Sequence, residues 1–186
     1  MKILAFAGSL RKESLNLKLV RIAAGLAAEA GHDVTVAELA EYQIPLYDGD
    51  VEAVSGLPAG AARLAAAVKQ ADGVIISAPE YNASVSGVLK NAVDWISRDK
   101  GDPLEGKPIL LLSASPAMVG GNRGLWHLRV PLEACGAFVN PEMYSLAQAH
   151  QEFAAAGNLV SPKRLESLQA LVIAFLKTAG ALTNAT

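Results

Sequence analysis

Five short apolar runs, each bounded by turn-forming residues, constrain the fold of this chain more than any other feature. The runs are mostly continuous rather than alternating, which is typical of strands covered on both faces of a sheet. Segments with apolar residues at helical spacing lie between them. This alternation predicts a parallel sheet with helices on both faces and right-handed crossovers. The runs are Ile3 to Ala7, Val34 to Ala37, Gly73 to Ala78, Ile109 to Leu112 and Ala137 to Val139.

The helices are expected between these runs and after the last one. The first begins near Asn16 and ends near Gly31, and the second contains the apolar positions Ala61 to Val68. We expect one domain over residues 1–186, with the strand order 2-1-3-4-5. In such sheets ligands bind beyond the carboxyl ends of the strands, beside the first strand. The later helices are predicted over Gly87 to Arg98, Asn122 to Cys135 and Ser161 to Ala179, and a long loop over Ala40 to Gly56.

Composition excludes several classes of partner. Of the 186 residues 52% are apolar, and 16 basic against 18 acidic residues give a net charge of −2, scattered along the chain. Without a basic stripe we expect no nucleic-acid partner, and without a polybasic patch or a long apolar run we expect no membrane partner. Cys135 is the only cysteine, which excludes an internal disulfide and indicates a reducing compartment, the cytoplasm.

The first loop, residues 8–16, has the composition of an anion-binding turn. It connects the first apolar run to a helix, whose first N–H groups lack partners and carry partial positive charge. Ser9 and Ser14 can donate hydrogen bonds from their hydroxyls and Asn16 from its amide, and the Arg11 guanidinium supplies positive charge with paired N–H donors. The three-glycine dinucleotide motif and the P-loop motif are absent, so a terminal monophosphate held without metal fits best. The alternative is a solvated turn whose Ser and Asn cap the helix.

Two further loops follow the third and fourth predicted strands and should converge with the first. In the second loop, residues 79–87, Pro79 ends the strand, and Glu80 and Asn82 lie in a turn whose amides suit the edge of a flat heteroaromatic ring. Tyr81 either borders such a ring or makes an ordinary packing or subunit contact. The third loop, residues 113–121, offers Ser113, Ser115 and the flexible Gly120, although a plain strand-to-helix connection explains it nearly as well.

Together these loops resemble the NADPH-dependent FMN reductase family, whose members include quinone, azo-dye and chromate reductases. The resemblance covers most of the chain and implies a flavodoxin-like three-layer sandwich with bound FMN. It implies that Ser9, Arg11, Ser14 and Asn16 bind the FMN phosphate, that Pro79, Glu80, Tyr81 and Asn82 bind the isoalloxazine, and that Ser113, Ser115 and Gly120 cover its remaining side. The motifs that carry it are Gly8-Ser9-Leu10-Arg11 with Ser14 and Asn16, and Pro79-Glu80-Tyr81-Asn82 with Ser84, Gly87, Leu89-Lys90-Asn91-Ala92 and Asp94-Trp95.

The same resemblance implies the chemistry. The flavin N5 accepts hydride from NADPH or NADH in a ping-pong cycle and passes electrons to a quinone, azo dye, chromate or free flavin, so no side chain is predicted to be catalytic and no metal is required. It also implies a homodimer or homotetramer in which the loop around Pro45 to Asp48 approaches a neighbour's flavin. One departure is Ser86, where relatives often carry proline, which predicts a looser second loop.

Other functions remain as alternatives. A flavodoxin-like electron carrier or a flavin-binding sensor would share the fold and the FMN, although such carriers are typically strongly acidic, unlike this chain. A serine hydrolase is disfavoured because the chain lacks a G-x-S-x-G elbow, and His32, His127 and His150 show no triad spacing. These three scattered histidines make no metal signature either.

Overall fold

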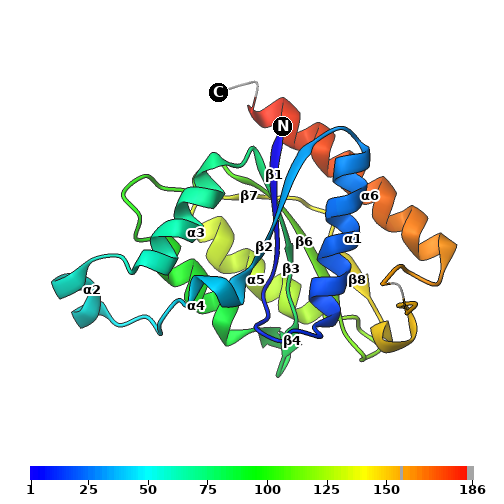
Figure 1. Ribbon diagram of the computed structural model, residues 1–186, viewed down its shortest axis with the longest axis horizontal. Helices are drawn as coiled ribbons and strands as arrows, with labels where there is room; N and C mark the ends of the chain where they lie inside the picture. Colours follow the sequence, from blue (N-terminus) through cyan, green and yellow to red (C-terminus); the bar gives the residue numbers. More distant parts are fainter. Residues whose placement is uncertain (156, 184–186) are drawn as a thin grey trace.

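A central parallel sheet organises the molecule (Figure 1). The computed structural model describes residues 1–155 and 157–183. The strand order is β2-β1-β3-β6-β7, with β8 also paired to β6, so the predicted order 2-1-3-4-5 is confirmed. These strands are β1 (Lys2–Ala7), β2 (Asp33–Glu38), β3 (Gly73–Ser77), β6 (Pro108–Ala114), β7 (Phe138–Val139) and β8 (Tyr144–Leu146).

The fifth strand position is filled by two short pieces. Strand β7 pairs with the beginning of β6, where Pro108 lies beside Phe138, and β8 pairs with its end, where Leu112 lies beside Tyr144. Pro141 lies between the two pieces and has no N–H to donate to the β-ladder. The predicted strand Ala137 to Val139 was therefore only the first half of this position.

Helices cover both faces of the sheet, as Figure 1 shows. Alternate residues of the strands point to opposite faces, so Leu110 and Leu112 pack under α1 and α6, whereas Ile109 and Leu111 pack under the other helices. The result is two apolar cores separated by the sheet. The first pair is α1 (Leu15–Glu29) and α6 (Pro162–Thr183), and the opposite set is α3 (Ala59–Gln70), α4 (Gly87–Ile96) and α5 (Asn122–Ala134).

Some boundaries and short elements differ from the prediction. Helices α4 and α5 end before the predicted Arg98 and Cys135, while α6 continues past Ala179 to Thr183. The predicted loop over residues 40–56 contains α2 (Gly49–Ser55), which buries no residue and projects from the body of the molecule (Figure 1). Also unpredicted were the 3-10 turns η1 (Leu39–Tyr42) and η2 (Ala149–Gln151), the strand β8, and the hairpin of β4 (Glu80–Tyr81) and β5 (Ser84–Val85).

Within the described residues, α6 is the single unbroken helix long and apolar enough to cross a membrane. Its most apolar side chains, however, include Leu168, Val172 and Phe175, which are buried against the sheet and α1. Only about 33% of this apolar stretch is buried, so packing on the sheet accounts for part of its apolar character.

Candidate functional site

The first loop leaves β1 at the carboxyl edge of the sheet and is held there by α4. A Cβ on Gly8 would lie 2.7 Å from Leu89 Cδ2, so close packing rather than a left-handed backbone favours glycine here. The buried Ser86 donates a hydrogen bond from Oγ to Gly8 O (2.7 Å) and accepts one from Leu89 N (3.4 Å). The expectation that Ser86 loosens the second loop was therefore wrong, because its hydroxyl ties that loop to the first.

Asn16 joins three segments of the site through hydrogen bonds within the protein. Its Oδ1 accepts from Ser77 Oγ and from Ala114 N, both at 2.9 Å, and its Nδ2 donates to Ala114 O at 2.9 Å. The side chain is buried and connects α1 to the ends of β3 and β6. These hydrogen bonds hold the first loop to the ends of β3 and β6. Direct contact of Asn16 with a phosphate stays a prediction.

The other polar groups of the first loop are available to a ligand. Ser14 is buried at the start of α1, yet its side chain makes no capping hydrogen bond, and the first turn of α1 contains no acidic residue. Ser9 Oγ accepts from Arg11 N at 3.3 Å, which leaves its O–H free to donate. Among the described residues, the Arg11 guanidinium has no hydrogen-bond or ion-pair partner. These donors surround an electropositive helix end, which suits an anion.

Seven of the eleven predicted cofactor residues line one hollow of about 80 Å³ at this edge of the sheet. Its volume suits a phosphate-sized end group rather than a whole three-ring cofactor. The structure thus brings the three loops together as expected from the strand order. The seven are Arg11, Ser14, Asn16, Pro79, Glu80, Tyr81 and Ser115.

The second loop contains a tight hairpin. Strands β4 and β5 are joined by Asn82 and Ala83, which both have left-handed backbones with φ of 50° and 62°. Two consecutive residues of this kind are typical of a type I′ turn. The preceding Tyr81 is 47% exposed and lines the hollow, which leaves one part of its ring open to a ligand or a partner.

The carboxylate of Glu80, in the hairpin, is bound by residues at the start of α5. Its Oε1 accepts from Arg123 Nε at 2.8 Å and its Oε2 from Gly124 N at 3.2 Å, with 6% of the side chain exposed. Burial alone raises the pKa of Glu80, but the hydrogen bonds from Arg123 and Gly124 outweigh it and lower the pKa below its usual value. Sequence reasoning missed Arg123, because nothing local in the chain connects it to a residue 43 positions away.

The third loop is shaped by close packing. Ser113 is buried on the α5 side of β6, and its Oγ, which lacks a hydrogen-bond partner among the described atoms, lies against Gly121. Gly120 has a left-handed φ of 62°, and a Cβ there would lie 2.9 Å from Ala147 N. Neither residue lines the 80 Å³ hollow, so flavin contact by Ser113 and Gly120, like that of Asn82 and Ser9, stays a prediction.

Other candidate sites are less well supported. Residues 1–155 and 157–183 contain no group of three His, Cys, Asp or Glu placed to hold a metal. His127 Nδ1 lies 3.1 Å from Ser84 Oγ, but the described residues show no carboxylate bonded to this exposed imidazole, as a hydrolytic triad requires. A larger hollow of about 510 Å³ lies along α1 and the start of α6 and is lined by none of the predicted cofactor residues.

Comparison with known proteins identifies the family. The sequence model described as "NADPH-dependent FMN reductase" matches residues 1–151. The chain belongs to this family. It is 37% identical to a quinone reductase of Escherichia coli strain K12, over 94% of this chain and 93% of the relative. It is 36% identical to an NAD(P)H-dependent FMN reductase of Pseudomonas aeruginosa, over 91% and 90% of the two chains.

Solved structures agree on the fold. FerB of Paracoccus denitrificans, a flavoenzyme NAD(P)H:(acceptor) oxidoreductase, is 31% identical, with a TM-score of 0.83 and 97% of each chain covered. Flavodoxin 1 of Bacillus cereus, 15% identical with a TM-score of 0.61, shares the flavodoxin-like fold. The protein is accordingly an oxidoreductase of the FMN reductase family whose cofactors are FMN and NAD(P)H.

The residues present fit FMN. A phosphate requires donors without protein partners at an electropositive end, and Arg11, Ser14 and the first turn of α1 provide them. A flat ring requires an accessible border, which the exposed face of Tyr81 and the hairpin turn provide. The missing capping bond at Ser14 is explained if its hydroxyl binds the cofactor.

Proposed function

We propose that this enzyme transfers electrons from NAD(P)H to a quinone, with azo dyes, chromate and free flavin as further acceptors. The observation that carries this proposal is the convergence of seven predicted residues from three separate loops on one hollow beside β1. The names of the E. coli and Paracoccus relatives support a quinone or a similar acceptor. Bound FMN supplies the hydride and electron transfer, in two alternating half-reactions.

The chain's own residues bind and orient the cofactor. Arg11 and the Ser9 and Ser14 hydroxyls hold the phosphate, and the N–H groups of the second and third loops stabilise negative charge on the ring. Glu80 is engaged with Arg123 and Gly124, so it positions the hairpin rather than acting as an acid or base.

The absorption spectrum of the purified protein, recorded anaerobically before and after NADPH or NADH is added, tests this function. We expect flavin bands that bleach within the mixing time and return when a quinone is added. Bands that persist in the presence of both donors would instead support an electron carrier or a flavin-binding sensor. A protein that contains no flavin and binds no added FMN would contradict the proposal altogether.

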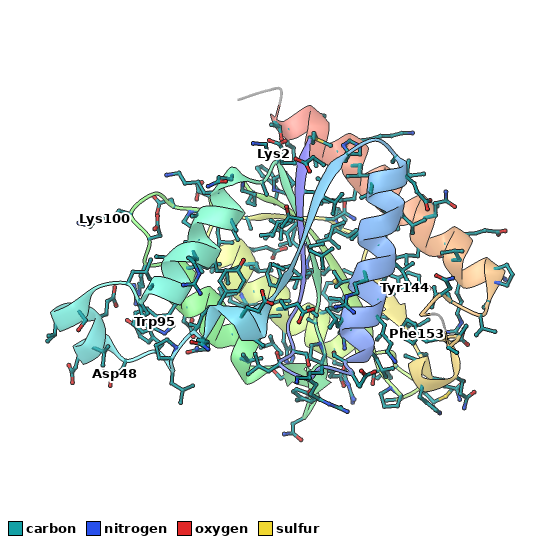
Figure 2. The ribbon with its side chains drawn as sticks, viewed as in Figure 1. Lys2, Asp48, Trp95, Lys100, Tyr144 and Phe153 are labelled. Atoms are coloured by element: carbon teal, nitrogen blue, oxygen red, sulfur yellow. The ribbon has the colours of Figure 1, made fainter. Side chains whose placement is uncertain are left out.

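We also propose a homodimer or homotetramer. The segment before α2 is fixed to α4, since Trp95 Nε1 and Asn91 Nδ2 both donate to Pro45 O at 2.8 Å, and Figure 2 marks Trp95 and Asp48 in this region. Leu46 and Val54 nevertheless remain 84% and 88% exposed on this rigid projection. Light scattering should give a mass of two or four chains, and Leu46→Asp should lower it, whereas Val160→Asp should not. A monomeric wild type would contradict the proposal.

A reducing compartment is consistent with this function. NAD(P)H is the electron donor of the family, and the single cysteine, Cys135, is free. We therefore propose a cytoplasmic location.

A further inference from the structure

A second hollow, which we call the β2 groove, lies on the other side of the first loop. It measures about 370 Å³ and is formed by the first loop and by the residues that follow β2. Arg11 lines both the β2 groove and the 80 Å³ hollow, so the two adjoin at this residue. No residue of the second or third loop lines the groove, so it is a different hollow, although Ser9, assigned above to the FMN phosphate, borders it together with Arg11.

The groove combines apolar side chains with two cations that have no protein partner. Ala7, Leu17 and Leu39 are buried apolar residues of its lining. In the described part of the chain, the Lys12 ammonium, like the Arg11 guanidinium, has neither an ion pair nor a hydrogen bond. Lys12 therefore places an unpaired positive charge beside an apolar surface, next to the Arg11 guanidinium assigned above to the FMN phosphate.

Acidic and amide groups complete the lining. Glu38 is neutralised by Arg21, whose Nη2 donates to its Oε1 at 2.7 Å, so it does not cancel the charge of Lys12. Glu41, whose carboxylate has no ion pair among the described residues, and Gln43 follow β2 and add hydrogen-bond acceptors to the lining. Together these groups match a nucleoside phosphate: cations for phosphate, an apolar surface for a base, and acceptors for ribose hydroxyls.

The place of the groove in the sheet supports a dinucleotide. In open α/β sheets ligands bind beyond the carboxyl ends of the strands, at the switch point beside the first strand. The site assigned to the flavin occupies the β3 and β6 side, and the β2 groove occupies the opposite side of the same turn. A donor whose nicotinamide lies at the flavin can extend its other end past Arg11 into this groove.

We propose that the β2 groove binds the adenosine phosphate end of NAD(P)H, with Lys12 contacting its phosphate groups. This inference rests on the proposed function, since it names the second binding region of the same reaction. It assigns to Lys12 a role in donor binding and leaves the first-loop hollow to FMN.

The test compares Lys12→Ala with Lys18→Ala in the FMN-loaded enzyme. Lys18 is a matched control because it is paired with Glu13 at 3.5 Å and lines the 510 Å³ hollow, not the β2 groove. At a saturating quinone concentration, Lys12→Ala should raise the KM for NADPH on the order of tenfold with little change in kcat, as expected for the loss of one charge-assisted contact. If the KM rises for NADPH but not for NADH, the partner of Lys12 is the 2′-phosphate. If the KM rises equally for NADH, the partner of Lys12 is the diphosphate.

A direct binding measurement separates this inference from the proposed function. Adenosine 2′,5′-bisphosphate, measured by calorimetry, should bind the FMN-loaded wild type and the Lys18→Ala variant, and bind Lys12→Ala on the order of tenfold more weakly. Absence of binding, or equal KM values for the two variants, overturns the inference while NADPH oxidation by the wild type still supports the proposed function. A wild type that oxidises no NAD(P)H contradicts the proposed function, yet the bisphosphate still tests the groove.

The adenosine phosphate of a different flavin, FAD, has the same chemistry, so its binding is measured as well. If Lys12→Ala weakens FAD but changes neither FMN affinity nor the KM for NADPH, the groove serves the flavin and the donor assignment is wrong. If FMN and FAD affinities both stay unchanged while the KM for NADPH rises, the donor assignment is supported.

Discussion

At the scale of single residues, Ser86 makes two hydrogen bonds that proline lacks the groups to make. Its buried hydroxyl donates to Gly8 O and accepts from Leu89 N, so it connects the first loop to the start of α4. Ser86→Ala should reduce the free energy of unfolding by about 1–2 kcal/mol, because a buried carbonyl loses its donor and a helix loses its cap. Urea unfolding at neutral pH measures this change, and FMN should dissociate faster from the variant.

Ser97→Ala is the matched control for this prediction. Ser97 lies at the other end of α4, and its half-buried hydroxyl donates to Asp94 O at 2.9 Å within the same turn. It does not connect the helix to another segment, so its loss should cost less and leave FMN retention unchanged. Equal effects of the two substitutions would contradict the connecting role of Ser86.

At the scale of elements, the ion pair of Glu80 and Arg123 fastens the β4–β5 hairpin to the start of α5. Because the folded protein lowers the pKa of Glu80, the unfolded chain binds its proton more readily. The stabilisation is therefore complete above the ordinary pKa of the carboxyl and is lost as the pH falls through the lower folded pKa. Glu80→Gln should cost about 1–3 kcal/mol at pH 7, and the difference from wild type should shrink as the pH falls through the folded pKa of Glu80.

The pair of Glu133 and Arg129, in which the carboxylate rather than the guanidinium is the more exposed group, provides the comparison. Arg129 Nη2 lies 2.6 Å from Glu133 Oε1, but 46% of the Glu133 side chain is exposed. A carboxylate this accessible to water is strongly screened, so Glu133→Gln should change the unfolding free energy by at most about 1 kcal/mol at any pH. An unfolding difference for Glu80→Gln that does not depend on pH would show that its charge is not what fastens the hairpin.

The elements also show what the sequence alone predicts. Continuous apolar runs mark β1, β3 and β6 because both faces of these strands are covered, and helical spacing marks α1 and α3 because one face packs on the sheet. The β4–β5 hairpin and β8 are only two or three residues long, too short for a periodic pattern, and depend on contacts distant in sequence. For the same reason the partnership of Glu80 with Arg123 was not predictable.

At the scale of the whole molecule, phosphate binding at the first loop should determine how strongly the cofactor stabilises the fold. A ligand at 100 times its dissociation constant adds about 2.7 kcal/mol to the folded state. For a chain of this size each kcal/mol raises Tm by about 2–4 °C, so FMN should raise it by about 5–11 °C. Calorimetric melting of the protein stripped of flavin, with and without added FMN, measures the shift.

Two comparisons test whether the phosphate of FMN causes the rise in Tm. Riboflavin has the same ring without the phosphate, so at equal concentration it should raise Tm much less than FMN does. Arg11→Ala should lose most of the Tm shift produced by FMN, because Arg11 supplies the full positive charge of the 80 Å³ hollow. Lys100→Ala should keep the shift, because Lys100, labelled in Figure 2, lies far from the β4 strand labelled in Figure 1. If riboflavin stabilised the chain as much as FMN, or Arg11→Ala kept the whole shift, the ring would dominate binding and the first loop would not be the phosphate site.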